Sequence, residues 1–440
     1  MLNTGPLLQV SKDWKRILSS EEICRRLLLL RFPDEAASLT CQPSNVGDLL
    51  LRRSKRWHAF QYGRPYSKTT LVIDFEREQL ERTAFAYHDG NLAFINESGT
   101  GIVTSLDDGS LYRLIGPDNN RDSLLNLAVS KSLICGISAL GFCYVSDYIK
   151  DIHRSFRLPR VSFKEITSNG RCVCVFEANT DKVSGIIWDF ESEQSRSFEI
   201  SHRGRDIHLG LHPKEDSIFV ISWDETAICR FSRYTFDGTE LGSQVFTIDR
   251  PFMMARSYFN IHPRDRSGRM SLFYGMGMSS SDLTMEDGHF VFDPKYDRLM
   301  KHEYPFSPLK QQVAGGQKLW QEERWPDRLN LGFCFEEMVY TVYIKDGFQP
   351  MIVIRDLHEQ TLPVEPEVST NCGTSIVPRD PPPLERQNYF LCGDDKFLVL
   401  LTESGAEIFC FDEDIRLPDE DSSYRDRRRK RLEERLAKQA

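Results

Sequence analysis

The sequence predicts a mainly β protein, a seven-bladed β-propeller with six or eight blades as alternatives, preceded by a small helical segment. Two observations carry this prediction. From Thr69 to Asp412 the chain consists of short apolar runs separated by Gly, Asp, Asn and Ser, which is typical of many antiparallel strands. The first thirty residues instead space their apolar side chains three and four apart, as helices do.

Seven runs share one outline: an apolar strand, a polar turn and a second strand. Their starts lie 41, 39, 46, 52, 69 and 58 residues apart. The runs are Leu92–Leu114, Leu133–Tyr148, Cys172–Phe190, Ile218–Phe236, Met270–Phe292, Val339–Ile354 and Phe397–Phe411. Four-stranded units of about forty to fifty residues indicate propeller blades, which cover each other's faces in a ring. A pair of β-sandwiches is the structural alternative, and it predicts no common period.

Local landmarks support the repeat. An Asp follows an apolar strand four times, and a His-Pro pair occurs twice in similar surroundings. These residues are Asp189, Asp293, Asp356 and Asp412, with His212-Pro213 and His262-Pro263. The last run, Tyr389–Phe411, supplies only about three strands, so we expect Thr69–Phe75 to add the fourth and join the two ends of the chain. Ser307–Arg328 and Leu362–Arg386 are predicted to be loop insertions.

The segment Val10–Arg31 predicts two short amphipathic helices. Its apolar residues are Val10, Trp14, Ile17 and Leu18, then Ile23, Leu27 and Leu30. Ser19 and Glu22 form a capping-box pattern that predicts the start of the second helix. A third helix is expected over Ser44–Tyr62, with Arg52, Arg53, Lys55 and Arg56 on its wetter side. The predicted units are therefore helices at 1–33, a linker with a basic helix at 34–68, the propeller at 69–412 and a charged tail at 413–440.

Composition and charge narrow the class of protein. The 440 residues are 40% hydrophobic and 28% charged, a balance typical of globular proteins. The chain shows no membrane-length apolar run and no secretory signal, so we expect no membrane partner and a cytoplasmic or nuclear location. The eleven cysteines lack metal-site spacing and are interpreted as reduced core thiols.

Net charge is −9, yet residues 1–68 carry twelve Lys and Arg against six Asp and Glu. The tail from Arg425 is also basic. The acidic body argues against binding to nucleic acid. The two basic ends are expected to bind something anionic, including the body of this protein itself.

Catalytic, cofactor and metal motifs are not found. The sequence lacks a phosphate-binding glycine loop, a nucleophile elbow and a zinc or calcium pattern. His208 and His212 lie four apart, but Gly210 and Pro213 disfavour a helix, so turn chemistry or packing is favoured over metal binding. We therefore expect no catalytic residues, no metal and no cofactor. A third class of function also remains open: a propeller enzyme, in which catalytic side chains converge on the central channel.

The run V-S-K-D-W-K-R-I-L-S-S-E-E-I, followed by C-R-R-L, resembles the second half of an F-box. Only Met1–Gln9 precede it, so the resemblance is to a partial module. Together with the predicted propeller, the chain resembles a fungal-type F-box protein. The resemblance implies a substrate-recognition subunit of a cullin-based (SCF-type) ubiquitin ligase, with an unknown protein client. The adaptor subunit, and through it a cullin, would contact an apolar face made of Val10, Trp14, Ile17, Leu18, Ile23 and Leu27. The alternative is a non-catalytic scaffold whose helices merely brace the sheets.

Overall fold

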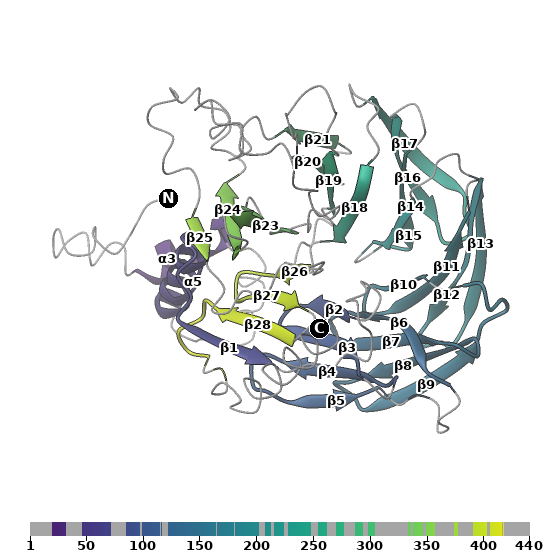
Figure 1. Cartoon of the computed structure of the whole chain (residues 1–440), viewed down its shortest axis with the longest axis horizontal. Helices are drawn as coiled ribbons and strands as arrows, with labels where there is room; N and C mark the ends of the chain where they lie inside the picture. The colour runs from purple at the N-terminus through teal and green to yellow at the C-terminus, as the bar shows by residue number, and fades with distance from the viewer. Residues whose placement is uncertain are drawn as a thin grey trace, which may run out of the picture.

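The computed structural model describes residues 20–31, 46–71, 85–96, 99–114, 116, 122–163, 165–179, 181–201, 207–212, 215–223, 228–247, 254–261, 270–276, 287–293, 298–303, 333–335, 338–345, 349–356, 374–376, 390–402, 405–415 and 417. Within these ranges the protein is mainly β, with two helices and seven four-stranded antiparallel sheets, as Figure 1 shows. The prediction of a mainly β chain preceded by helices is confirmed.

The helices are α3 (Glu21–Arg31) and α5 (Val46–Gln61). The strands of the first four sheets are β2 (Phe85–His88), β3 (Asn91–Ile95), β4 (Gly101–Ser105) and β5 (Leu111–Arg113); β6 (Leu124–Val129), β7 (Leu133–Ser138), β8 (Phe142–Asp147) and β9 (Ile152–Arg157); β10 (Glu165–Ser168), β11 (Cys172–Ala178), β12 (Lys182–Asp189) and β13 (Ser195–Ser201); and β14 (Ile207–Leu211), β15 (Ser217–Trp223), β16 (Ile228–Thr235) and β17 (Glu240–Thr247).

The strands of the remaining three sheets are β18 (Met254–Ile261), β19 (Met270–Met276), β20 (Asp287–Asp293) and β21 (Arg298–Glu303); β22 (Phe333–Phe335), β23 (Met338–Lys345), β24 (Gln349–Asp356) and β25 (Thr374–Ile376); and β26 (Phe390–Gly393), β27 (Phe397–Thr402), β28 (Gly405–Cys410) and β1 (Ser67–Leu71). Each of the seven predicted runs coincides with the second and third strands of one sheet, with some ends one or two residues short of the strand. The sequence repeat therefore corresponds to a repeat of sheets.

The burial of the strands explains why the central strands dominate the sequence pattern. Every residue of β7 and β28 is buried, because these strands are covered on both faces and their apolar runs are nearly continuous. The outer strand β13 buries only Phe198 and Ile200, two residues apart on one face. Outer strands are therefore short of apolar residues and harder to recognise in the sequence.

The last sheet joins the two ends of the chain. Its order is β1-β28-β27-β26, and β1 pairs antiparallel with β28 from Ser67 opposite Cys410 to Leu71 opposite Ala406. Figure 1 shows β1, in purple, beside the yellow C-terminal strands. The expected pairing of the strand near Thr69 with the C-terminal run is confirmed.

One of the two predicted loop insertions needs correction, and the other lies outside the described residues. The predicted insertion Leu362–Arg386 contains β25, which pairs with β24 as the fourth strand of its sheet. Only three residues long, β25 is too short to give a periodic signal. The other predicted insertion, Ser307–Arg328, lies outside the described residues, as does the charged tail after Leu417.

The hydrophobic core lies between successive sheets. Tyr148 and Ala93, for example, belong to neighbouring sheets and share one cluster, while Trp188 and Val145 share another. In this way each sheet buries faces that it cannot cover alone. The four-stranded unit is therefore the building block, and its neighbour completes its core.

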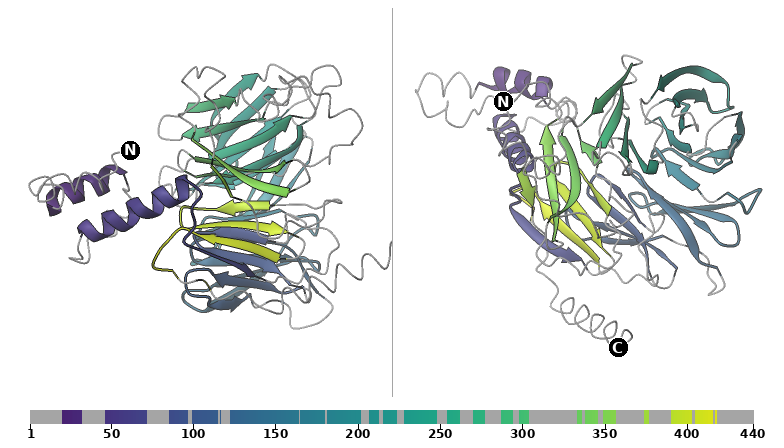
Figure 2. Two further views of the ribbon diagram at one scale, coloured as in Figure 1. Left: turned by 60° about the vertical axis from the view of Figure 1, so that its left-hand side comes forward. Right: turned by 45° about the horizontal axis from the view of Figure 1, so that its top comes forward.

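The helices extend from the last sheet as a pair, which Figure 2 shows in purple outside the sheets. Neither described helix is long and apolar enough to cross a lipid bilayer. The start of α3 differs from the prediction by one residue. The helix begins at Glu21, Ser20 Oγ accepts a hydrogen bond from the Ile23 amide at 3.4 Å, and Glu22 binds Arg26 within the helix.

Candidate protein-docking site

The helix pair of α3 and α5 is the candidate docking site, and its own packing is the first element of that site. Cys24 and Leu28 of α3 are buried against Val46 of α5. Leu49, Leu50 and Trp57 of α5 pack on the same cluster. Leu28 is fully buried, so one face of α3 is committed to α5.

A second apolar face of α3 remains accessible beside the packed one. Ile23, Leu27 and Leu30 follow one another at i, i+4 and i+7, which aligns them along one flank of the helix. Ile23 and Leu27 are half-buried and Leu30 is 76% exposed. We call these three residues the α3 stripe. It is an apolar surface that the described part of the chain leaves partly open.

The predicted adaptor-binding residues divide into two groups. Ile23 and Leu27 lie together on α3, as the spacing predicted. Val10, Trp14, Ile17 and Leu18 lie outside the described residues.

The predicted set omitted three exposed leucines of the helix pair. These are Leu29, Leu30 and Leu51, which are 53%, 76% and 40% exposed. A signal for the first two was present, because four consecutive leucines at 27–30 cannot all face one side of a helix.

The C-terminal end of α5 holds the pair on the last sheet through apolar contacts. Ala59 and Phe60 are buried in one cluster with Phe409, Phe411 and Leu400. The Phe60 and Phe411 rings meet edge to face, with centroids 5.3 Å apart. This geometry is favourable for aromatic pairs and fixes the direction in which α5 leaves the sheet.

Ion pairs reinforce the apolar anchor. Four basic residues within little more than one turn of α5 reach acidic groups that follow strands of the last sheet. Arg52 lies 3.0 Å from Asp414, and Lys55 lies 2.8 Å from Glu413. Arg56 bridges Asp395 at 2.9 Å and Asp412 at 2.8 Å, and Arg53 also pairs with Asp395.

The prediction that this basic side of α5 is its wetter side is wrong for two residues. Arg53 is 5% exposed and Arg56 is 11% exposed, and Asp395 is inaccessible. A buried carboxylate requires such partners, because an unpaired charge in the interior is costly. The expectation that a basic end binds the body of the protein itself is confirmed for α5.

The ion pairs also shift the protonation equilibria of this region. Burial alone would raise the pKa of Asp412, but hydrogen bonds from Arg56 and the Asp414 amide, with the charges of Arg56 and Lys396, lower it below its ordinary value of 3.8. The hydrogen bond to Asp414 raises the pKa of Arg52. The hydrogen bond to Glu413 likewise raises the pKa of Lys55. These charged forms are stabilised by the contact.

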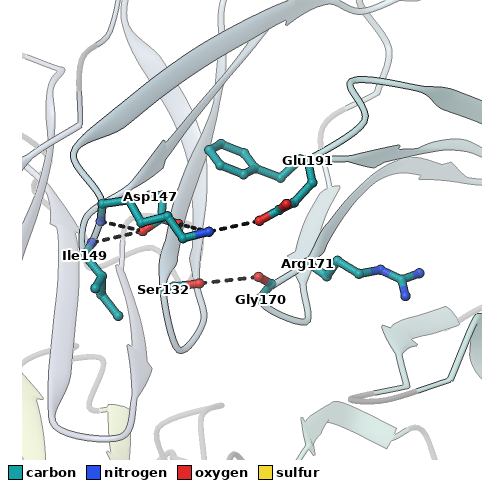
Figure 3. Close-up of a pocket in the computed structure, with 8 residues that line it drawn as sticks. Ser132, Asp147, Ile149, Gly170, Arg171 and Glu191 are labelled. Atoms are coloured by element: carbon teal, nitrogen blue, oxygen red, sulfur yellow. Dashed lines mark hydrogen bonds and ion pairs between the residues drawn. The ribbon is translucent and has the colours of Figure 1, made fainter.

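A small pocket lies between the β6–β9 and β10–β13 sheets, where their turns meet (Figure 3). Its volume is about 130 Å³, below the size usual for ligand sites. Lys150 Nζ lies 2.9 Å from Glu191 and 3.7 Å from Asp147, and Arg171 pairs with Asp216. The charges of the pocket already serve contacts between sheets, so we assign it a structural role.

Two of the landmark residues of the repeat act in turns. Asp189 Oδ1 accepts hydrogen bonds from the amides of Glu191 at 3.1 Å and Ser192 at 2.9 Å. His212 is buried, and its Nδ1 accepts the Glu215 amide at 2.8 Å, which confirms the expected turn role. The seven cysteines whose side chains the structure describes are all buried, in agreement with their interpretation as core residues, and burial raises the pKa of Cys135 to about 12.

No protein-family model matches the chain, and a search of the curated proteins finds no match.

Proposed function

We propose that the protein is a non-catalytic recognition subunit of a cullin-based ubiquitin ligase, in which the helix pair binds the adaptor and the sheets bind a protein client. We further propose that the seven sheets form a closed seven-bladed propeller. Contacts between most pairs of neighbouring sheets, made chiefly by first strands, support the ring. The pairing of β1 with β28 supports its closure between the two ends of the chain.

The observation that carries the docking role is the α3 stripe. Leu30 is 76% exposed and lies only two residues from the buried Leu28, on the opposite side of the helix, so α3 has an inner face for α5 and an open apolar face for a partner. Exposed apolar groups on a rigidly anchored helix are suited to burial in a groove of another subunit. Trp14 and Leu18 of the F-box-like run would extend the same contact.

The mechanism of such a subunit is proximity. The adaptor and cullin would hold a charged ubiquitin carrier, and the sheets would hold the client. The effective concentration of a client lysine near the carrier then rises without any bond being made or broken by this chain. A fixed angle between the helix pair and the sheets serves this role, because it sets the distance between the bound client and the ubiquitin carrier.

Co-purification tests the proposal. The intact chain is expected to capture the adaptor and cullin, and Trp14→Ala combined with Leu18→Ala is expected to lose both. Leu30→Asp should weaken capture at least tenfold. Leu140→Asp is the matched control, since Leu140 is also exposed, at 53%, but lies on the β7–β8 turn. Failure of the intact chain to capture either partner would overturn the ligase role.

A scaffold function is the second candidate, and the anchoring of α5 favours it. Five ion pairs and the buried Phe60 join α5 to the last sheet, as expected for a brace. A brace predicts that Leu30→Asp changes no interaction, whereas loss of Phe60 destabilises the sheet. The two functions therefore differ in the response to an exposed leucine.

A further inference from the structure

The two ends of the chain meet in a cluster of opposite charges that has the form of a latch. Its basic half is Arg52, Arg53, Lys55 and Arg56 on α5. Its acidic half comes from two places in the last sheet: Asp395 in the β26–β27 turn, and Asp412–Asp414 directly after β28. We call these residues the latch.

The latch is the main polar link between the helix pair and the sheets. Among the described elements, α3 packs chiefly on α5, so its position depends on how α5 is held. The apolar anchor of α5 lies at its C-terminal end, around Phe60. The ion pairs begin two turns earlier, at Arg52, and so act on the part of α5 that the apolar anchor does not reach.

The latch has a buried part and an exposed part. Asp395 is inaccessible between Arg53 and Arg56, whereas Arg52 and Asp414 are each 55% exposed. Lys55 and Glu413 are 46% and 34% exposed. The outer pairs can therefore be changed without placing an unpaired charge in the interior.

We propose that this end-to-end latch is a conformational device: when its outer pairs are broken, α3 and α5 loosen from the sheets as one unit while the sheets stay folded. The inference concerns the attachment of the helix pair and holds whether or not a ligase adaptor binds. It assigns to Asp412–Asp414 the role of fixing the orientation of α3, a helix from the opposite end of the chain.

Charge reversal with rescue tests the latch. Arg52→Glu with Lys55→Glu is expected to speed hydrogen exchange of the α3 and α5 amides at least tenfold and to leave β11 and β12 unchanged. Adding Glu413→Lys and Asp414→Lys restores opposite charges in swapped positions. This four-residue variant is expected to return α3 and α5 to the exchange rates of the original chain.

The matched control is Lys150→Glu with Arg171→Glu, which reverses two exposed basic residues between other sheets. It should leave the helix pair unchanged. Where the reversed chain does not fold, Glu413→Gln alone is measured, with an expected threefold rise in exchange confined to α5 and α3. Unchanged exchange in the helix pair, an equal rise in β11 and β12, or absence of rescue would each overturn the proposal.

Discussion

At the scale of single residues, Asp395 is the position where we expect substitution to cost the most stability. Its carboxylate is inaccessible and pairs with two guanidinium groups. We expect Asp395→Asn to lower the free energy of unfolding by about 3 to 5 kcal/mol, because it leaves two positive charges facing a neutral amide. Chemical denaturation measures this change. Glu191→Gln removes an exposed ion pair and should change stability by less than about 1 kcal/mol; equal losses in the two variants would contradict the role of burial.

Gly185 is a position where a single methyl group meets three neighbours. A Cβ at Gly185 would lie 2.6 Å from the Val175 carbonyl oxygen, 2.7 Å from Phe198 and 2.8 Å from Phe176. We expect Gly185→Ala to destabilise the chain by about 1 to 3 kcal/mol, as measured by the thermal midpoint. Gly242→Ala, on the open strand β17, meets no atom within 4 Å and should change stability by less than about 0.5 kcal/mol.

Asp412 gives the latch a defined pH dependence. Since its folded pKa lies below the ordinary value of 3.8, its contribution to stability is complete above that value and is lost as the pH falls through the folded pKa. The difference in unfolding free energy between the original chain and Asp412→Asn should therefore shrink below about pH 4. Urea titrations across pH measure it. A difference that stays constant down to pH 2 would contradict the assignment.

Residue roles were the hardest part to predict from the sequence. The composition of α5 was evident, but Arg53 and Arg56 were expected to be wet because their partner Asp395 lies more than three hundred residues away along the chain. By contrast, His212 was correctly interpreted, because its turn partner Glu215 is three residues away. Local chemistry can be read from local sequence, whereas a distant ion pair cannot.

At the scale of elements, α3 shows how two neighbouring residues take opposite roles. Leu28→Ala leaves a cavity in the contact between α3 and α5. It should therefore lower the free energy of local opening of α3 by about 2 to 5 kcal/mol. Leu30→Ala removes an exposed side chain and should change it by less than about 0.5 kcal/mol. Hydrogen exchange of the α3 amides distinguishes the two. Equal effects would mean that Leu30 is covered by the chain itself.

The helices and strands were predicted correctly where their apolar pattern extends over many residues. The second and third strands of all seven sheets coincide with predicted runs to within one or two residues, because two-sided burial makes them continuously apolar. The short strand β25 was missed, and the second helix begins after Ser20 instead of Ser19. Both serines can cap a helix, so the local sequence does not distinguish between them.

At the scale of the whole molecule, β1 is important because it completes a sheet whose other three strands come from the C-terminal part of the chain. A chain lacking residues 1–71 loses β1 and leaves the buried strand β28 as an open edge. We expect its urea midpoint to fall and its aggregation to increase. A chain lacking residues 1–45 keeps α5 and β1 and should retain the original midpoint. Equal midpoints for the two deletions would contradict this role of β1.

The whole-molecule pairing was predictable for a simple reason. The last run offered three strands where the other units offer four, and the segment near Thr69 had no sheet of its own. Counting strands was therefore enough to place β1 beside β28. The charges that accompany this pairing, from Arg52 to Asp414, were not predictable by counting.

The pairing of β1 with β28 has a consequence for biosynthesis. On the ribosome β1 emerges early, whereas β28 is the last of the described strands to be translated. Until then the nascent chain must carry α5 and β1 without their partner, so the last sheet can form only after β28 has been translated. We expect chaperones to be needed most in that interval. A premature stop codon before Gly405 would remove β28 and leave α5 and β1 without their partner strand.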